Sequence, residues 1–378
     1  MDKFGDIRPY TDEEAREAFQ RIAQDPHVEP IAKYINPGVP ADVMRGLLAS
    51  LTSVWDFQHK VMYGVVTSII KQTTDGVTYS GIENLKDGKT HLLISNHRDI
   101  ILDPAIIQVL LYENKVHTTE IAVGDNLISS QFIEDITRSN GMIKVVRGGT
   151  PREIYSNSNH LSEYLRSKIS NGICSAWIAQ RNGRTKDGRD ETSQGLVKML
   201  QMSGAGDFVK DYGDLNIVPI SISYQFEPCD FLKARELYIS RREQYVKKPG
   251  EDLQSMLTGL TQYKGGVHYH FAPSLSNEVI KGCAELDKNE RYKAIAGAID
   301  KEILYNYKLW NNNYIAYDIL NNSSSYIEHY TPEEKEAFTA YMDGGLMKII
   351  EAENGIDLNE LREIFLGIYA NPVAAISK

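Results

Sequence analysis

Residues 92–111, LLISNHRDIILDPAIIQVLL, decide the fold that the sequence predicts. The first three of these residues are apolar, and residues 92–95 indicate a short buried strand. A helix is expected to begin at Asp103-Pro104, with Asp103 as the N-cap and Pro104 at the first helical position. A strand, a polar loop and a helix in this order are typical of an open α/β sheet, in which ligands bind at the carboxyl ends of the strands.

The loop between the expected strand and helix begins with a histidine, His97, and ends at a carboxylate, Asp103. A carboxylate that bonds to an imidazole fixes its tautomer and stabilises the imidazolium, so the ring can act as a general base on a hydroxyl. A His near an Asp is also ordinary loop polarity, so the pair alone decides nothing. The triplet His97-Arg98-Asp99 matches a kinase motif, but Pro104 stands where a kinase needs Asn, and no glycine-rich loop precedes it.

The composition describes a globular protein and excludes several classes. Hydrophobic residues make up 42% of the 378 residues, as in a globular protein. The apolar run that comes nearest to the length of a membrane span is interrupted by Arg98, Asp99 and Asp103. A net charge of −10 argues against general binding of nucleic acid. Three scattered cysteines predict neither a disulfide framework nor a metal site, and the acidic first residues lack the apolar core of a signal peptide. We therefore expect a cytoplasmic protein.

The order of the expected elements divides the chain into two domains. Residues 1–75 carry helical patterns only, which predicts a small helical domain. In residues 76–378 strands alternate with helices, which predicts an α/β domain with a mostly parallel mixed sheet flanked by helices and a helical C-terminal extension. The expected strands cover residues 76–81, 92–95, 119–123, 142–146, 173–179, 217–223 and 267–271.

A second polar stretch, residues 180–191, also follows a buried strand. It contains Arg181, Arg184 and Lys186 together with two glycines, and a similar but weaker case is Arg147 after another strand. Arg offers a planar fork of donors, Lys a point charge, and Gly allows the backbone to approach a ligand, so such a loop suits a phosphate. A solvated basic turn is the alternative. Because the carboxyl ends of parallel strands share one edge, these loops should converge with that of His97.

These motifs resemble those of the glycerolipid acyltransferases, and most closely those of the soluble, plastid-type glycerol-3-phosphate acyltransferases and of 1-acylglycerol-3-phosphate acyltransferases. The four blocks that carry the resemblance are residues 81–85, 95–105, 177–186 and 218–220. The soluble branch also has a helical domain ahead of its catalytic domain, and residues 1–75 are expected to be its counterpart. The resemblance therefore covers residues 76 to about 230 and is specific as a combination.

The resemblance implies a role for each polar residue of the loops. It makes His97 the base that activates a hydroxyl of glycerol-3-phosphate or of a lysophospholipid, and Asp103 the carboxylate that orients the base. It places Arg184 and Lys186 on the phosphate of the substrate, with Arg147 as a further candidate. Supporting roles are expected for Arg98, which either reaches the pocket or pairs with a carboxylate such as Asp99, and for Asp99 and Arg181.

Two departures from the family pattern leave alternatives open. The family has four residues between His and Asp, whereas five separate His97 from Asp103, so either the loop bulges or Asp99 takes the role of the carboxylate. We favour Asp103, because Asp-Pro-Ala at the helix start matches the family and a loop absorbs an insertion easily. The second departure is Gln180-Arg181-Asn182, where the soluble branch commonly has Pro-Ser-Gly. The identity of the acceptor therefore stays open.

The resemblance also implies the partners of the protein. The acyl donor would be a thioester of acyl carrier protein or of coenzyme A, with no metal or organic cofactor and with a peripheral membrane contact as a further option. Because acyl carrier protein is acidic, we expect it to dock on a basic surface of the charged helical region 231–262. The cations of this surface would be Lys233, Arg235, Arg241, Arg242, Lys247 and Lys248.

Three other functions fit the same residues. The first is a catalytically silent protein of the same fold that binds a lipid or an acyl carrier, because the altered spacing of His97 and Asp103 could abolish catalysis. The second is an acyltransferase for a lipid acceptor without a phosphate. The third is a phosphate-dependent hydrolase that uses the same basic pocket.

Overall fold

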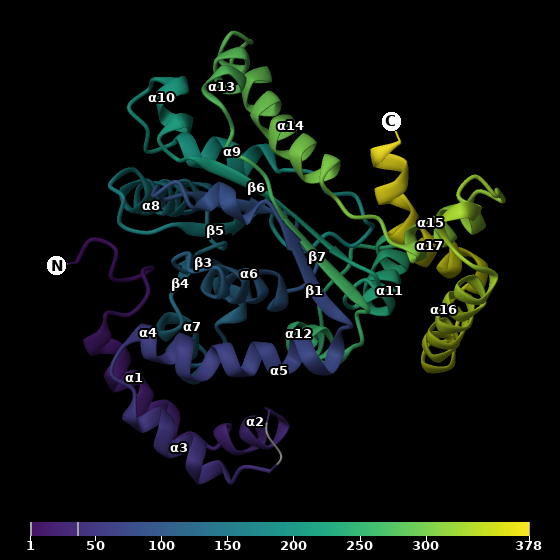
Figure 1. The fold of residues 1–378 in the computed structure, drawn as a ribbon, viewed down its shortest axis with the longest axis horizontal. Coiled ribbons are helices and arrows are strands. Elements are labelled where there is room, and N and C mark those ends of the chain that lie inside the picture. Colours follow the sequence, from purple (N-terminus) through teal and green to yellow (C-terminus); the bar gives the residue numbers. More distant parts are fainter. Residues whose placement is uncertain (1, 36–37, 378) are drawn as a thin grey trace.

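The centre of the computed structural model, which describes residues 2–35 and 38–377, is a mixed β-sheet (Figure 1). The described residues form seven strands in the order β1-β7-β6-β2-β5-β3-β4. All neighbouring strands are parallel except β6 and β7, which are antiparallel. The strands are β1 (Gly76–Ser80), β2 (Leu92–Ser95), β3 (Glu120–Gly124), β4 (Met142–Val145), β5 (Ala176–Ala179), β6 (Ile217–Tyr224) and β7 (Gly266–Phe271). The predicted α/β fold with a mostly parallel mixed sheet is confirmed.

Helices cover both faces of the sheet, so the central strands are buried and mostly apolar. β2 and β6 are buried along their whole length, as expected for strands without a solvated face. One face packs on α5 (Tyr63–Thr73) and α6 (Leu102–Glu113). The opposite face packs on α8 (Pro151–Ser170), α9 (Gln194–Gln201), α10 (Phe208–Gly213), α13 (Asn277–Ala284) and α14 (Glu290–Tyr305).

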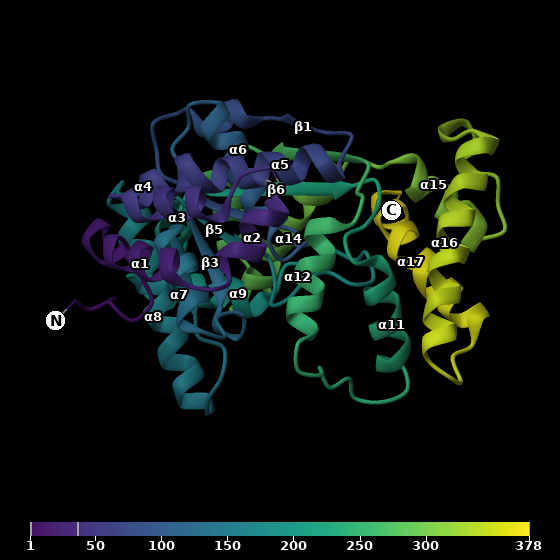
Figure 2. The same ribbon diagram turned by 90° about the horizontal axis from the view of Figure 1, so that it is seen from below.

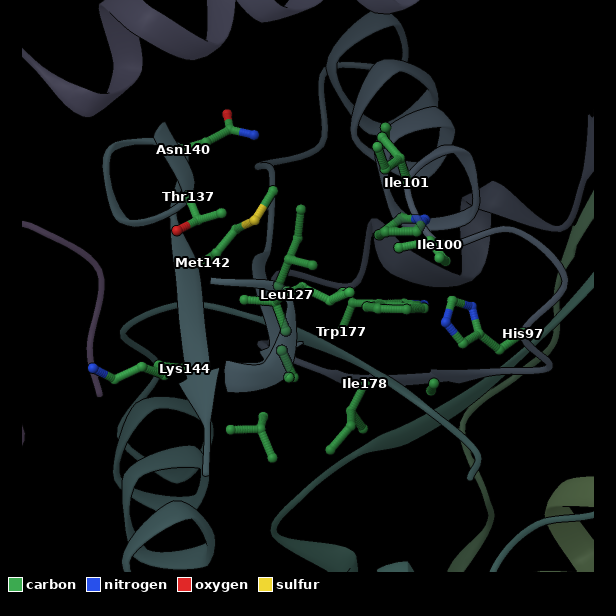
Figure 3. Close-up of a pocket in the computed structure, with 18 of the residues that line it drawn as sticks. His97, Ile100, Ile101, Leu127, Thr137, Asn140, Met142, Lys144, Trp177 and Ile178 are labelled. Atoms are coloured by element: carbon green, nitrogen blue, oxygen red, sulfur yellow. The ribbon is translucent and has the colours of Figure 1, made fainter. Parts of the chain in front are cut away.

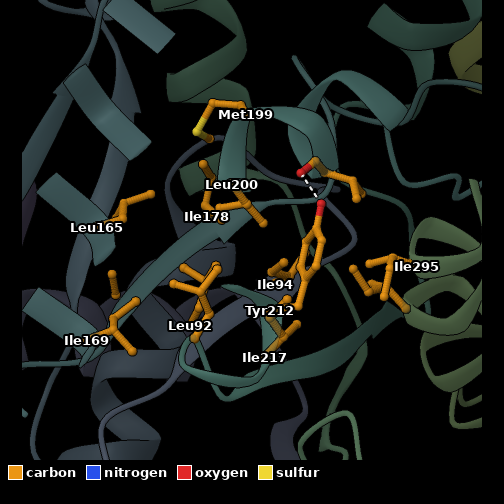
Figure 4. Packing of buried hydrophobic residues seen from close by; sticks show 14 of the residues in the cluster. Leu92, Ile94, Leu165, Ile169, Ile178, Met199, Leu200, Tyr212, Ile217 and Ile295 are labelled. Atoms are coloured by element: carbon orange, nitrogen blue, oxygen red, sulfur yellow. Dashed lines mark hydrogen bonds between the residues drawn. The ribbon is translucent and has the colours of Figure 1, made fainter. Parts of the chain in front are cut away.

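Figure 4 shows the packing on this second face, where Leu92 and Ile94 of β2 meet Leu165 of α8 and Leu200 of α9. Tyr212 is fully buried there, and its hydroxyl donates to the main-chain oxygen of Val197 at 2.7 Å. The polar end of the ring is thus satisfied inside an apolar cluster. This packing holds β2, which carries the His97 loop, against its neighbours.

The N-terminal segment is helical, as the sequence predicts. Its elements are α1 (Asp12–Gln24), α2 (Val28–Ile35), α3 (Ala41–Ser50), α4 (Val54–Phe57) and a π-helical turn, η1 (Gln58–Met62), before α5. Thr11 and Glu14 form a capping box at the start of α1. This cluster of helices also packs on Phe132 and Ile136 of α7 (Gln131–Ser139). The separation of residues 1–75 as a domain of its own stays a prediction.

The C-terminal helices form a group at one end of the molecule (Figure 2). They are α11 (Asp230–Ser240), α15 (Asn311–Leu320), α16 (Pro332–Ala352) and α17 (Leu358–Ile376), while α12 (Glu251–Thr261) lies nearer the sheet. Phe231 stacks on Phe365, with ring centroids 5.0 Å apart. The amide of Asn371 donates to the main-chain oxygen of Asp187 at 2.7 Å, so α17 supports the loop of residues 180–191. None of the helices that the structure describes is both long and apolar enough to cross a bilayer.

The start of α6 differs from the expectation. The helix begins at Leu102, so Asp103 is its second residue and not the N-cap, and Pro104 is the third. The carboxylate of Asp99 accepts from the main-chain N–H groups of Ile101 and Leu102, at 2.9 and 2.7 Å. Because Asp99 satisfies these donors, the carboxylate of Asp103 is free to turn towards the loop.

Candidate active site

His97 and Asp103 meet at the carboxyl end of β2. Nδ1 of His97 lies 2.9 Å from Oδ2 of Asp103, which is fully buried. The same oxygen accepts from the main-chain N–H groups of Arg98 at 2.6 Å and Asp99 at 2.9 Å. The other oxygen, Oδ1, accepts from the hydroxyl of Tyr224 at 2.7 Å. These four donors hold the carboxylate in one orientation, which in turn orients the imidazole.

Tyr224 is a site residue that the sequence analysis missed. It is buried on β6, and burial raises its pKa well above the ordinary value of 10, so the hydroxyl remains a donor. Its neighbour Tyr269 donates to the main-chain oxygens of Leu102 and Asp103 at 3.3 and 3.2 Å. The sequence indicated only that Tyr224 faces the core: side chains alternate between the two faces of a strand, so Tyr224 lies on the same face of β6 as Ile220 and Ile222.

The free nitrogen of His97 is available for proton transfer. With Nδ1–H donating to Asp103, Nε2 is the acceptor, and the side chain is 13% exposed. The ring stands edge-on to Trp177 of β5, with centroids 5.8 Å apart, and both residues line one cavity (Figure 3). The imidazole can therefore take a proton from a hydroxyl that enters this cavity.

Asp99, the alternative partner of His97, lies elsewhere. Its Oδ1 caps α6, and Oδ2 has no hydrogen-bond partner among the described residues. A Cβ on Gly259 of α12 would overlap Oδ2, so the glycine allows the helix to lie against this carboxylate. Burial and the neighbouring Asp103 raise the pKa of Asp99. Of the two carboxylates, Asp103 is the one that bonds to His97.

Arg98 points away from the cavity. Its guanidinium is fully buried and pairs with Asp190 and, at 3.2 Å, with Glu227. Of the two expectations for Arg98, entry into the pocket is wrong; it pairs with carboxylates, but these are Asp190 and Glu227 and not Asp99. Asp190 and Glu227 lie beside the guanidinium, whereas Asp99 caps the start of α6 through Oδ1.

The predicted phosphate-binding cations fall into two groups. Arg147 and Arg181 line the cavity together with His97. Arg184 and Lys186 are not among the described lining residues. Nη1 of Arg184 is buried without a partner among the described residues, and Lys186 pairs with Glu236. The predicted convergence of the loops is confirmed for the first group. For Lys186, burial and nearby cations, Lys247 and Arg184 foremost, lower the pKa to about 8.

The cavity has a volume of about 530 Å³ and is mostly apolar. It lies where β3 and β5 diverge, because these strands pair only at Glu120 with Ala176 and at Ile121 with Trp177. Side chains from both faces of the sheet consequently line it, among them Met142 and Leu127 beyond Trp177 (Figure 3). Such a cavity suits a long apolar chain whose reacting end lies at His97.

Residues 76–223 match the protein family described as Acyltransferase. This part of the chain is therefore similar to an acyltransferase domain. The matched residues begin at β1, end in β6 and include His97, Asp103 and the loop of residues 180–191. The resemblance to the acyltransferases is thereby confirmed at the level of the family.

Two further comparisons describe the relatives of the chain. This chain is similar to the crystal structure of the 1-acyl-sn-glycerophosphate (LPA) acyltransferase PlsC from Thermotoga maritima. The match covers 76% of this chain and 93% of that protein's chain, with 12% sequence identity and a TM-score of 0.39. The search of the curated proteins found no match.

The predicted docking surface beside the acyltransferase domain is not a free basic surface. Lys233 is buried and pairs with Glu227 at 2.6 Å, which contradicts its expected exposure. The other ion pairs of the region are Arg235 with Glu353, Arg241 and Arg242 with Glu360, and Lys247 with Asp252. Glu353 and Glu360, which neutralise the three arginines, lie far along the chain, so no local pattern reveals these pairs. In the described part of the chain no group of three or more His, Cys, Asp or Glu is placed to hold a metal ion.

Proposed function

We propose that this protein transfers a fatty acyl group from a thioester of acyl carrier protein or coenzyme A to a hydroxyl of glycerol-3-phosphate or of a lysophospholipid. The observation that carries the proposal is the bond between His97 and Asp103 at an apolar cavity, inside a domain of the acyltransferase family. Neither the donor nor the acceptor follows from the family alone, so both belong to the proposal.

The proposed chemistry is direct transfer without an acyl-enzyme. Nε2 of His97 takes the proton of the acceptor hydroxyl while its oxygen attacks the thioester carbonyl. The tetrahedral intermediate then collapses, the C–S bond breaks, and the thiolate receives the proton from the imidazolium. Asp103 holds the tautomer that leaves Nε2 free and stabilises the imidazolium. The proposed steps use side chains alone.

The cavity supports a fatty acyl chain as the transferred group. Trp177 lies next to His97, and Leu127 and Met142 lie farther inside (Figure 3). Burying each methylene of a chain there contributes about 0.8 kcal/mol to binding, and this energy also positions the carbonyl at the mouth.

The cations support an acceptor with a phosphate. Arg147 and Arg181 line the same cavity as His97, and Arg184 follows in the same loop as Arg181. A phosphate held there would orient the hydroxyl for transfer. One observation favours a second candidate, an acyltransferase for an acceptor without a phosphate: Arg184 and Lys186 do not line the cavity, and Lys186 already has a carboxylate partner.

The test is to incubate the purified protein with palmitoyl-coenzyme A or palmitoyl-acyl carrier protein and with matched acceptors. Glycerol-3-phosphate and 1-acylglycerol-3-phosphate are compared with glycerol and 1-monoacylglycerol, and both ester and free thiol are measured. The proposal expects ester only with a phosphorylated acceptor. Ester with both kinds of acceptor at equal rates supports the second candidate, and thiol release without ester contradicts both.

A further inference from the structure

Asp190 joins the loop of the proposed base to the loop of the proposed phosphate-binding cations. Its side chain is only 1% exposed. Oδ2 accepts from the guanidinium of Arg98 and, at 3.2 Å, from the amide of Asn96. Oδ1 accepts from the hydroxyl of Thr185 at 2.7 Å. The carboxylate of Asp190 thus bonds to both neighbours of His97 in the chain, Asn96 and Arg98. It also bonds to Thr185 of its own loop.

The main chains of the two loops are also bonded to each other. The N–H of Thr185 donates to the oxygen of His97 at 2.7 Å, and that of Gln180 donates to the oxygen of Ser95 at 2.8 Å. Thr185 lies between Arg184 and Lys186 in the sequence. The loops therefore continue the pairing of β2 and β5, and any shift of Thr185 moves the cations relative to the base.

The bonds of Asp190 belong to a buried group of two cations and two carboxylates. Arg98 also pairs with Glu227, whose Oε1 accepts from Lys233 at 2.6 Å. Lys233 further donates to the main-chain oxygen of Arg98 at 2.8 Å. Charges buried in equal number stabilise one another, and removing one leaves an uncompensated charge. This arrangement makes the position of Asp190 rigid.

None of Arg98, Thr185 and Asp190 is among the described residues that line the cavity, so they act on the reaction only through their neighbours. We propose that Asp190 is a positioning residue that fixes the cations of residues 180–191 relative to His97. A phosphate held by this loop would then present its hydroxyl to Nε2. The inference rests on the proposed function. It adds that the hydrogen bond from the hydroxyl of Thr185 to Asp190 affects the rate of transfer only to a phosphorylated acceptor.

The test uses Thr185→Val, which has nearly the same shape and keeps the main-chain bond to His97 but loses the hydroxyl. The specificity constant kcat/KM is measured with palmitoyl-coenzyme A and either 1-acylglycerol-3-phosphate or 1-monoacylglycerol. We expect kcat/KM to fall about tenfold for the phosphorylated acceptor, the size of one bond to a charged group, and to stay within about twofold for the other. Thr185→Ser, which keeps the hydroxyl, should restore the wild-type ratio.

Thr192→Val is the matched control. Thr192 is buried in the same segment, but its hydroxyl donates to Asp300 at 2.5 Å and not to Asp190. We expect the ratio between the two acceptors to stay at its wild-type value in this variant.

Three outcomes separate the two claims. If Thr185→Val slows both acceptors equally, or neither, Asp190 is a structural residue only and the inference is wrong. If Arg184→Ala and Arg181→Ala leave the phosphorylated acceptor unaffected, the proposed function fails instead. Loss for the phosphorylated acceptor in Arg184→Ala and in Thr185→Val, but not in Thr192→Val, supports both.

Discussion

Nδ1 of His97 lies 2.9 Å from Oδ2 of Asp103, although five residues separate the two in the chain. The loop absorbs the additional residue by wrapping around the carboxylate, which accepts from the main-chain N–H groups of Arg98 and Asp99. Asp99 in turn holds the first turn of α6. The altered spacing therefore preserves a bonded His–Asp pair.

This geometry assigns different consequences to the two carboxylates. Asp103→Asn should lower kcat about a hundred- to ten-thousandfold, because an amide that faces the ring can stabilise the wrong tautomer. Asp99→Asn should change kcat much less, since asparagine also caps a helix well. Steady-state kinetics of both variants check the prediction. A larger loss in Asp99→Asn than in Asp103→Asn would show that Asp99 is the partner of His97.

The hydroxyl of Tyr224 should matter for both stability and turnover. Tyr224→Phe leaves Oδ1 of Asp103 without its donor, which costs about 1–3 kcal/mol of the free energy of unfolding and lowers kcat about tenfold. Tyr269→Phe is the control, because its hydroxyl contacts main-chain oxygens and not the carboxylate. Urea unfolding and kcat are measured for both variants. Equal kcat values in the two would contradict a role of Tyr224 at Asp103.

The fold could be predicted from local patterns to a large extent. The apolar run of β2 is encoded within a few residues, so this strand was found. The strand expected at 173–179 begins only at Ala176, because Ile173 and Cys174 bond back to the end of α8 through the main-chain oxygen of Lys168. Bonds of this kind depend on the packed helix and have no local signal.

The polar residues around the site could be predicted only in part. His97 and Asp103 were found because they lie in one short loop whose residue types suit a base. Tyr224 and Asp190 were missed because each acts on a residue far away in the chain. Arg98 was misplaced for the same reason: its partners, Asp190 and Glu227, come from other loops.

The charge of Lys186 should make phosphate binding depend on pH. Because its pKa is about 8, the ammonium is present below pH 8 and is lost above it. A phosphate monoester, whose second pKa is about 6, stays fully charged over this range. We expect KM for the phosphorylated acceptor to rise as pH increases through about 8. Lys186→Arg should remove this rise, because a guanidinium keeps its charge.

The pH series is run with the phosphorylated acceptor and with 1-monoacylglycerol as its control. A rise of the same size for both acceptors, or an unchanged rise in Lys186→Arg, would mean that Lys186 does not contact the phosphate.

The inner part of the cavity should set the preferred length of the acyl chain. Met142→Trp fills space beyond Leu127, so a long chain loses several buried methylenes at about 0.8 kcal/mol each. We expect kcat/KM for palmitoyl-coenzyme A to fall on the order of thirtyfold, while octanoyl-coenzyme A is little affected. Met347→Trp, at an exposed methionine of α16, is the control. An unchanged kcat/KM for palmitoyl-coenzyme A would place the chain outside this cavity.

The most direct test of the account is the removal of the proposed base. Wild-type protein, His97→Ala and His59→Ala, in which a second histidine of the cavity is replaced, are incubated with palmitoyl-coenzyme A with and without 1-acylglycerol-3-phosphate. We expect wild type and His59→Ala to release thiol only with the acceptor and in an amount equal to the ester formed. We expect at least a hundredfold loss in His97→Ala, with an unchanged circular dichroism spectrum. Ester formation by His97→Ala at the wild-type rate would contradict the account.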